Sequence, residues 1–230
     1  MKKTFLFLFF LANFHFLFAQ YGITGGFTKM NVPTWQIPVD TYITGTKSYF
    51  LKNGVYFEID RKFGLKNIRI DFYPGVKYNS QTFIIEDSKF KWTLAGFQVT
   101  AKFYTFDLNG NCNCPTFGHG GETFKKGFHF TLSPGVDYLF LIHQANSTEN
   151  HTIDINQEKI IFSISGGAGL DIGLSELLTL TPVVNLRYFP PVEWKGLTKE
   201  VSQGAETGKY DSNQIFQLFG GVRIGLNFGR

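Results

Sequence analysis

Alternation of apolar and polar side chains with a period of two, repeated over eight segments, is the feature that most constrains this chain. A period of two places successive side chains on opposite faces of a β-strand. The eight segments span residues 21–29, 55–61, 67–78, 93–104, 126–140, 159–173, 178–189 and 215–228. Several exceed the five or six residues typical of soluble strands and approach the length with which a tilted strand crosses a membrane. The pattern predicts an all-β protein with eight strands.

The two faces of each predicted strand differ in composition. In residues 126–140, one face carries Phe130 and Val136 and the other carries His129 and Asp137. Across the segments the polar faces combine glycines with charges of both signs: Glu58, Asp60, Asp71, Asp137, Asp171, Arg69, Lys77, Lys102, Arg187 and Arg223. Paired charges can fill a narrow eight-stranded lumen, whereas a solvent-facing surface rarely needs so much glycine. We therefore expect an eight-stranded antiparallel up-and-down transmembrane β-barrel with its apolar face toward lipid; a lipocalin-like soluble barrel is the alternative.

Three of the segments carry a proline in their middle. Pro74, Pro134 and Pro182 each fall on the apolar face, and each is followed two residues later by valine. Proline cannot donate a backbone hydrogen bond to a neighbouring strand. Because the repeat recurs on every second strand, and such strands run in the same direction in a meander, we expect a shared bulge or bend at one height of the barrel.

Tyrosine closes the apolar face of the same three segments. Tyr78, Tyr138 and Tyr188 stand where an interfacial aromatic girdle would lie on a membrane barrel.

Residues 1–19 have the features of a secretory signal peptide: Lys2 and Lys3, an apolar run over 5–18, and Ala19 before the expected cut. The mature chain, 20–230, is long enough for one domain. Without the two lysines the formal net charge of +4 falls to +2, and the basic residues form no stripe. This distribution argues against a nucleic-acid partner.

The connections between the predicted strands alternate between short turns and long polar loops. The long ones, at 31–53, 79–92, 141–158 and 190–214, are typical of the outer side of an outer-membrane barrel whose termini are both periplasmic. They contain Trp35, Tyr42, Tyr49, Trp194 and Tyr210, which we interpret as an aromatic contact surface for envelope proteins. The segment 107–125 breaks the pattern, since it is long on the expected periplasmic side, and it offers a second contact surface.

Two motifs raise the question of chemistry. Cys112 and Cys114 lie in the 107–125 segment, where they could form a local disulfide, remain as thiols, attach to a partner, or bind a metal with His119, although a fourth ligand is not evident. His129 and Thr131 invite comparison with the His-x-Ser of outer-membrane lipid A deacylases. Because both fall on the polar face and threonine replaces serine, we expect a luminal hydrogen-bonding pair. The sequence assigns no catalytic, cofactor-binding or metal-binding residue and no cofactor.

The signal peptide, the repeated PGV-x-Y strands, the Gly-rich segments and the closing GGVRIGLNF resemble the small outer-membrane β-barrel proteins of Gram-negative bacteria, of the PorT-like and OmpA-like barrel type. The resemblance covers residues 21–228, although Gly229 and Arg230 follow the terminal aromatic residue. It implies an outer-membrane location and contact with outer-membrane lipid. PorT-like relatives include components of a secretion apparatus, so the resemblance allows a non-enzymatic structural or interaction role within a larger complex. A lipid-modifying enzyme and a narrow channel are the alternatives.

Overall fold

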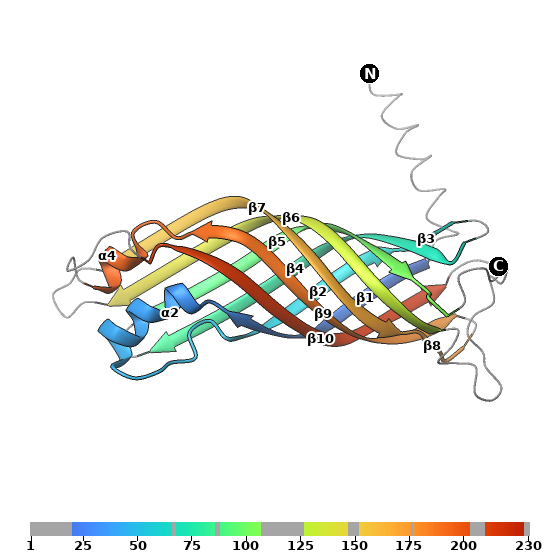
Figure 1. Cartoon of the computed structure of the whole chain (residues 1–230), viewed down its shortest axis with the longest axis horizontal. Helices are drawn as coiled ribbons and strands as arrows, with labels where there is room; N and C mark the ends of the chain where they lie inside the picture. Colours follow the sequence, from blue (N-terminus) through green and yellow to red (C-terminus); the bar gives the residue numbers. More distant parts are fainter. Residues whose placement is uncertain are drawn as a thin grey trace, which may run out of the picture.

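The computed structural model describes residues 20–65, 68–85, 88–106, 127–146, 152–175, 177–202 and 210–227. Long antiparallel strands wind around a common axis (Figure 1). The strands are β1 (Gln20–Asn31), β2 (Asn53–Arg61), β3 (Phe63–Gly64), β4 (Ile70–Ile85), β5 (Ser88–Phe103), β6 (Phe128–Asn146), β7 (Thr152–Leu170), β8 (Ile172–Gly173), β9 (Leu178–Glu193) and β10 (Ser212–Asn227). The helical elements are α2 (Pro33–Val39), the π-helix η2 (Asp40–Thr44) and α4 (Leu197–Val201).

The wall of the barrel is closed by its first and last strands. β1 pairs antiparallel with β10 from Gln20 opposite Asn227 to Asn31 opposite Phe216. β2 and β3 both pair with β4, and β7 and β8 both pair with β9, so each of these pairs is one wall strand in two parts. The described residues therefore form the predicted eight-stranded antiparallel up-and-down barrel. We call the end with Gln20 and Asn227 the terminal end, and the opposite end, which carries α2 and α4, the distal end (Figure 1).

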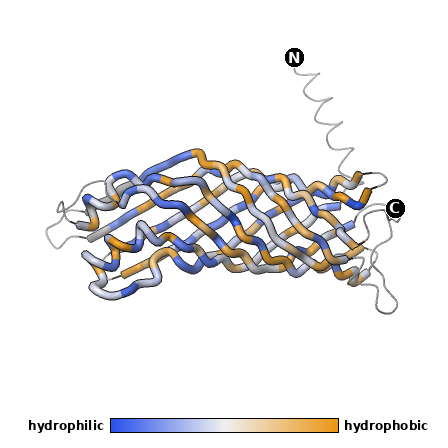
Figure 2. Tube along the Cα trace, viewed as in Figure 1, coloured by the Kyte–Doolittle hydropathy of each residue, from blue (hydrophilic) through white to orange (hydrophobic). Residues whose placement is uncertain are grey.

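The apolar face of each strand points outward, as predicted. Apolar and polar residues alternate along the strands (Figure 2). Phe27 and Phe162 are 78% and 66% exposed on the outer wall, while Lys77 and Asp137 are buried inside. A soluble barrel would bury its apolar side chains in the lumen, so this orientation excludes the lipocalin-like alternative and fits a wall that faces hydrocarbon.

Aromatic side chains lie at the distal edge of this apolar belt. Tyr78 and Tyr138 are exposed, and both flank Ala95 of β5 in the sheet. Tyr188 pairs with Phe216 of β10, and the two rings lie 5.2 Å apart. These positions fit the predicted interfacial girdle.

Of the predicted bulge or bend at the prolines, the bulge is wrong, and the bend stays a prediction. Pairing is interrupted at each proline only on the side of the preceding strand, and the register is the same on both sides of the interruption. Pro74 lies opposite the break between β2 and β3, Pro134 opposite a gap between Gln98 and Ala101, and Pro182 opposite the break between β7 and β8. Each proline thus leaves a short gap on the edge where its missing N–H would have donated.

Two of the four expected long outer loops are mostly strand. β4 and β5 stay paired as far as Ile85 opposite Ser88, and β6 and β7 as far as Asn146 opposite Thr152. These hairpins extend the barrel beyond its apolar belt. The connections around 31–53 and 190–214 are the ones that contain the helices, and none of the described helices is long and apolar enough to cross a bilayer.

Candidate functional site

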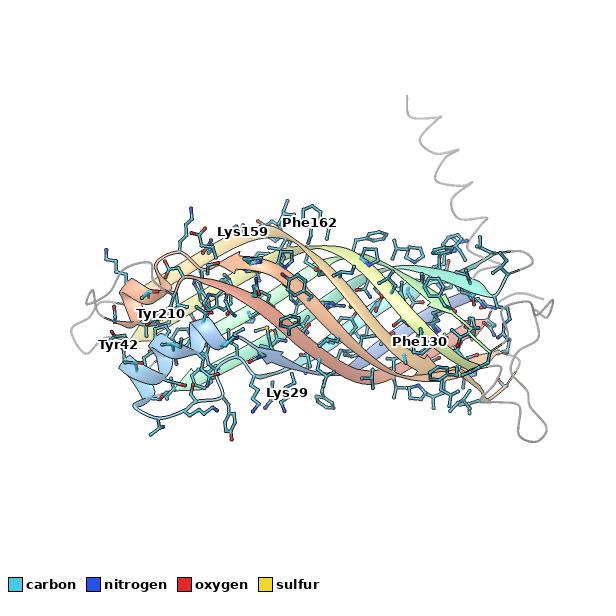
Figure 3. The ribbon with its side chains drawn as sticks, viewed as in Figure 1. Lys29, Tyr42, Phe130, Lys159, Phe162 and Tyr210 are labelled. Carbon is cyan, nitrogen blue, oxygen red and sulfur yellow. The ribbon has the colours of Figure 1, made fainter. Side chains whose placement is uncertain are left out.

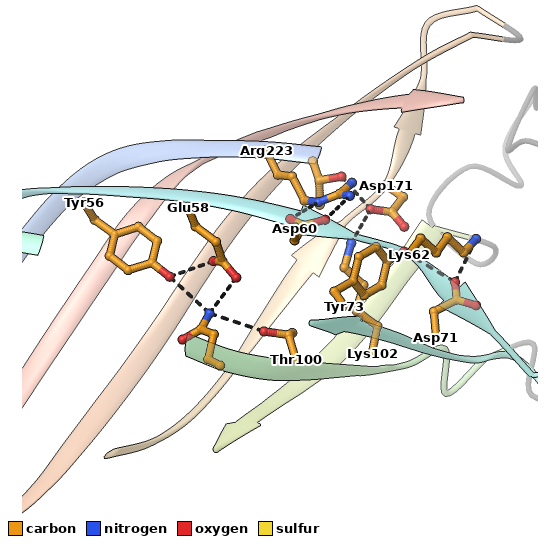
Figure 4. Close-up of polar contacts among 12 residues, drawn as sticks. Tyr56, Glu58, Asp60, Lys62, Asp71, Tyr73, Thr100, Lys102, Asp171 and Arg223 are labelled. Atoms are coloured by element: carbon orange, nitrogen blue, oxygen red, sulfur yellow. Dashed lines mark hydrogen bonds and ion pairs between the residues drawn. The ribbon is translucent and has the colours of Figure 1, made fainter. Parts of the chain in front are cut away.

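The lumen near the terminal end is filled by ion pairs. Arg223 of β10 donates two hydrogen bonds to Asp60 of β2, Nε to Oδ2 at 2.8 Å and Nη2 to Oδ1 at 2.6 Å. Lys102 of β5 lies 3.1 Å from Asp171, whose Oδ1 also accepts a 2.6 Å bond from Thr181. Figure 4 shows the two ion pairs, and we call their four residues the terminal ion-pair layer (Asp60, Lys102, Asp171 and Arg223). Each buried charge therefore has a close partner of opposite sign, as a dry interior requires.

Glycines make room for these long side chains. A Cβ on Gly22 of β1 would lie 2.1 Å from Arg223 Nη2, and a Cβ on Gly135 of β6 would lie 2.8 Å from Lys77 Nζ. The lumen is too narrow at these points for any side chain beside the charged group. These two glycines of the polar face are therefore packing positions.

The terminal ion-pair layer leaves little space around Tyr73. Lys102 Nζ and the Arg223 guanidinium lie 4.6 and 4.7 Å from the Tyr73 ring centre. The cavity beside them measures about 40 Å³. Since one water needs about 10–15 Å³ of such space, it holds a few water molecules at most.

Tyr104 directly follows β5 at the terminal end, and Asp171 lies between β7 and β8 in the wall strand that these two form. Tyr104 donates a 2.6 Å hydrogen bond to Asp171 Oδ2. Burial, reinforced by the charge of Asp171, raises the pKa of the Tyr104 phenol well above its usual range, so the phenol remains a donor.

A hydrogen-bond chain crosses the middle of the lumen. Arg187 Nη2 of β9 donates to Gln98 Oε1 at 2.9 Å, and Gln98 Nε2 donates to Glu58 Oε1 at 2.8 Å. Tyr56 donates to the other oxygen of Glu58 at 2.6 Å. The chain joins β9, β5 and β2, which are not neighbours in the wall, so it fills the cross-section.

A second cluster in the middle of the lumen joins β4, β6 and β7. Lys77 Nζ lies 3.0 Å from Asp137 Oδ2 and donates to Ser163 Oγ at 3.1 Å. Ser163 in turn donates to Asp137 at 2.9 Å. In this cluster and in the chain through Gln98, the charged groups are hydrogen-bonded to other luminal side chains rather than lining an open pore.

The distal part of the lumen is mostly apolar, which corrects the expectation of a polar lumen throughout. The residues of this distal plug are Met30, Val32, Trp35, Val39, Phe50, Leu51, Phe90, Trp92, Leu94, Leu139, Leu141, Ile161, Phe189, Val192, Trp194, Leu197, Val201 and Ile215. They come from inward positions of the strand extensions and from the segments around α2 and α4, which fold into the barrel mouth.

Two aromatic residues expected on the contact surface are instead part of the plug. Trp35 and Trp194 are fully buried, and their ring centres lie 5.5 Å apart. Trp35 also lies 5.8 Å from Trp92 of β5. Tyr42 and Tyr49 are exposed as expected, and Figure 3 shows Tyr42 and Tyr210 at the distal end.

Asp211 fixes the distal connection to the plug. Its backbone oxygen accepts a 2.9 Å bond from Trp35 Nε1. Its side chain accepts from the backbone N–H groups of Gly196 and Thr198, at 3.0 and 2.9 Å. One residue thus ties the start of α4 to the tryptophan carried by α2.

The sequence motifs with possible chemistry give a mixed outcome. His129 and Thr131 are both buried in the lumen: His129 Nδ1 lies 3.0 Å from Gly127 O, and Thr131 donates to Asn185 Oδ1 at 2.7 Å. This is the expected luminal placement, away from lipid substrate. Among the described residues, no three of His, Cys, Asp and Glu gather in a way that could hold a metal ion. Cys112 and Cys114, His119, the segment 107–125 and the expected signal peptide lie outside the described residues.

The closed wall, the outward apolar belt and the filled lumen define a small transmembrane β-barrel of the outer-membrane type. No family model matches the sequence, and no curated protein matches it. Among solved structures the chain is similar to Neisserial surface protein A (TM-score 0.44, 9% identity, covering 91% of this chain and 96% of that one) and to Ail of Yersinia pestis in complex with sucrose octasulfate (0.45, 10%, 90% and 99%). It is also similar to the N-terminal β-barrel domain of Pseudomonas aeruginosa OprF (0.40, 9%, 90% and 97%). Similarity at this level says nothing about function.

Proposed function

We propose that this protein is a non-conducting outer-membrane barrel that anchors an interaction surface in the cell envelope, with both termini in the periplasm and the distal end outside. In this role the barrel acts as a rigid membrane anchor and has no catalytic activity. The finer assignment, to a subunit of a larger complex of the PorT-like kind, rests on the sequence resemblance alone.

The observation that carries the proposal is the blocked lumen. The terminal ion-pair layer, the chain through Gln98 and the distal plug follow one another along the axis, and the cavity within the terminal layer measures about 40 Å³. A conducting barrel needs a continuous water-filled path, which an eight-stranded wall filled by side chains does not supply.

Conductance measurements test the blocked lumen directly. The mature chain, 20–230, is refolded and inserted into planar bilayers, with insertion verified by protection of the wall from protease. We expect no stable conductance steps. Reproducible steps from inserted protein would overturn the proposal and favour the channel alternative.

Site-specific crosslinking tests the interaction role. The exposed distal residues Tyr42 and Tyr49 are replaced in turn by a photocrosslinking amino acid in cells, with the exposed outer-belt position Phe162 as the matched control. We expect a discrete protein adduct from the distal positions and none from Phe162. Adducts with lipid alone at all positions, or a change in lipid A mass when the protein is removed, would contradict the role and support the enzyme alternative.

A further inference from the structure

A groove on the outer wall lies where the apolar belt meets the distal segments. It measures about 570 Å³ and is bounded by β1, β9 and β10 on one side and by the segment that links α2 to β2 on the other. The groove opens on the outside of the barrel, and Met30 and Phe50 of the distal plug form part of its lining.

The floor of the groove belongs to the apolar belt. It is formed by Leu186 of β9 and by Phe216 and Leu218 of β10, all about half exposed on the outer wall. Acyl chains beside the barrel would contact these same side chains, so the floor is continuous with the surface that faces lipid.

The rim of the groove is cationic. Lys29 follows the belt along β1 and stands opposite Leu218 in the sheet, and its side chain points away from the wall in Figure 3. Lys47 and Lys52 come from the segment before β2. The Lys52 ammonium lies 4.1 Å from the ring centre of Tyr49, which holds it at the rim.

Asp40, an acidic residue in the groove lining, already accepts hydrogen bonds from its neighbours. Asp40 Oδ1 accepts from the Ser48 backbone N–H at 2.8 Å, and Oδ2 accepts from Gln36 Nε2 at 3.1 Å. Gln36 also donates to the Ser48 backbone oxygen at 2.7 Å. These bonds hold the Asp40 carboxylate against Gln36 and Ser48. With three lysines and one carboxylate, the groove has an excess of positive charge.

One residue that lines the groove has a hydroxyl without a hydrogen-bond partner in the described part of the chain. The Ser48 hydroxyl oxygen is buried in a residue that lines the groove, and it has no hydrogen-bond partner among the residues that the structure describes. A buried hydroxyl without a partner is unfavourable, and an acceptor from a bound molecule would satisfy it.

We propose that this groove binds the headgroup of a phosphorylated, acylated glycolipid of the lipid A class, with its phosphates at Lys29, Lys47 and Lys52 and its acyl chains over Leu186, Phe216 and Leu218. An apolar floor selects a lipid over a free anion. A rim with three cations and one engaged acid fits two phosphates better than one. The inference rests on the membrane location in the proposed function, but it is independent of whether the lumen conducts.

Binding is measured on the refolded mature chain in zwitterionic phosphatidylcholine nanodiscs. The probes are diphosphoryl lipid A, monophosphoryl lipid A, phosphatidylglycerol and inorganic pyrophosphate. We expect diphosphoryl lipid A to bind most tightly and pyrophosphate to bind weakly. Equal binding of phosphatidylglycerol and lipid A, or tight binding of pyrophosphate, would overturn the proposed ligand class.

Matched variants distinguish lipid A binding at the groove from nonspecific attraction by positive charge. The triple variant Lys29→Gln, Lys47→Gln and Lys52→Gln should bind diphosphoryl lipid A at least about tenfold more weakly. The control Lys89→Gln, Lys91→Gln and Lys195→Gln removes the same charge from other distal positions and should bind within about twofold of the unaltered protein. Equal losses in both would overturn the site.

A second variant separates a loss of binding from a loss of folding. Lys47→Glu reverses one charge in the segment before β2, which is not part of the wall, and should also weaken binding while folded gel mobility is unchanged. Unaltered lipid A binding by folded Lys47→Glu and the folded triple variant would refute the groove. Conductance recorded on the same preparations tests the proposed function separately.

Discussion

The guanidinium of Arg223 crosses over Gly22 to reach Asp60. Gly22 of β1 pairs with Asp60 of β2 on one side and with Gly225 of β10 on the other. The two hydrogen bonds, 2.8 and 2.6 Å, therefore join the strands on either side of β1, at the place where the wall closes. Any side chain at Gly22 would occupy the path of the guanidinium. The ion pair thus links the closing strands from inside.

The ion pair between Arg223 and Asp60 predicts a large loss of stability when either partner is removed. Arg223→Met and Asp60→Leu should each destabilise the barrel by about 3–5 kcal/mol, because each leaves an unpaired buried charge. The double variant should lose less than the sum of the two, since neither charge remains. Urea unfolding in vesicles, followed by the gel mobility of folded protein, measures all three. A matched surface control is Lys159→Met, whose exposed partner Glu193 lies 3.7 Å away, and it should change stability by about 0.5 kcal/mol or less. Equal effects of Arg223→Met and Lys159→Met on stability would contradict a stabilising role of the buried ion pair.

The sequence predicts the belt and the polar lumen well because the alternation there is strict. It misses the plug because alternation stops at the distal end while the strands continue. In the run from Tyr138 to Ile142 every residue is apolar, so period two disappears. The structure places Leu139 and Leu141 in the plug. An uninterrupted apolar run beyond the girdle is the signal for a strand with both faces apolar. The burial of Trp35 and Trp194 has no comparable signal, since a loop that folds inward and one that stays outside have the same local composition.

The prolines show a second limit of sequence reasoning. Proline reveals a missing donor, but the identity of the neighbour that loses the bond depends on register. Pro134 lacks a donor toward β5 at a gap already present in the pairing, whereas Val136 pairs with Phe97 and Phe162 on both sides.

Replacing Pro134 by valine and replacing Val136 by proline should have unequal effects on the stability of the barrel. We expect Pro134→Val to change stability by about 1 kcal/mol or less, because the gap can accept the new N–H. Val136→Pro should cost about 3 kcal/mol or more, because it removes a ladder bond. Urea unfolding compares the two, and hydrogen exchange at Val99 and Thr100 shows whether the gap closes. Similar losses for both variants would mean that the prolines hold a required bend after all.

The belt makes a depth-dependent prediction. Val184 and Ile84 are both well exposed, at 57% and 67%, but Val184 lies within the apolar belt and Ile84 near the tip of the β4–β5 hairpin. Val184→Arg should destabilise the barrel in a bilayer by about 2–4 kcal/mol, and Ile84→Arg by about 0–1 kcal/mol, since only the first arginine enters hydrocarbon. Urea unfolding in vesicles measures the stability of both variants. Equal costs would place the membrane boundary elsewhere on the wall.

The distal plug should open without loss of the barrel, because its helical connections contribute nothing to the strand ladder. Trp194→Ala removes a fully buried indole that contacts Trp35, a change that costs about 3–5 kcal/mol in a packed core. We expect that cost to fall on local opening of the distal connections, so that added protease cleaves within 190–214 while folded gel mobility persists. Tyr49→Ala, at an exposed position in the other connection, should leave cleavage unchanged. Because the two remaining tryptophans, Trp35 and Trp92, also belong to the plug, their fluorescence should shift in Trp194→Ala before the wall unfolds in urea. A single transition shared by fluorescence and gel mobility would show instead that plug and wall unfold as one unit.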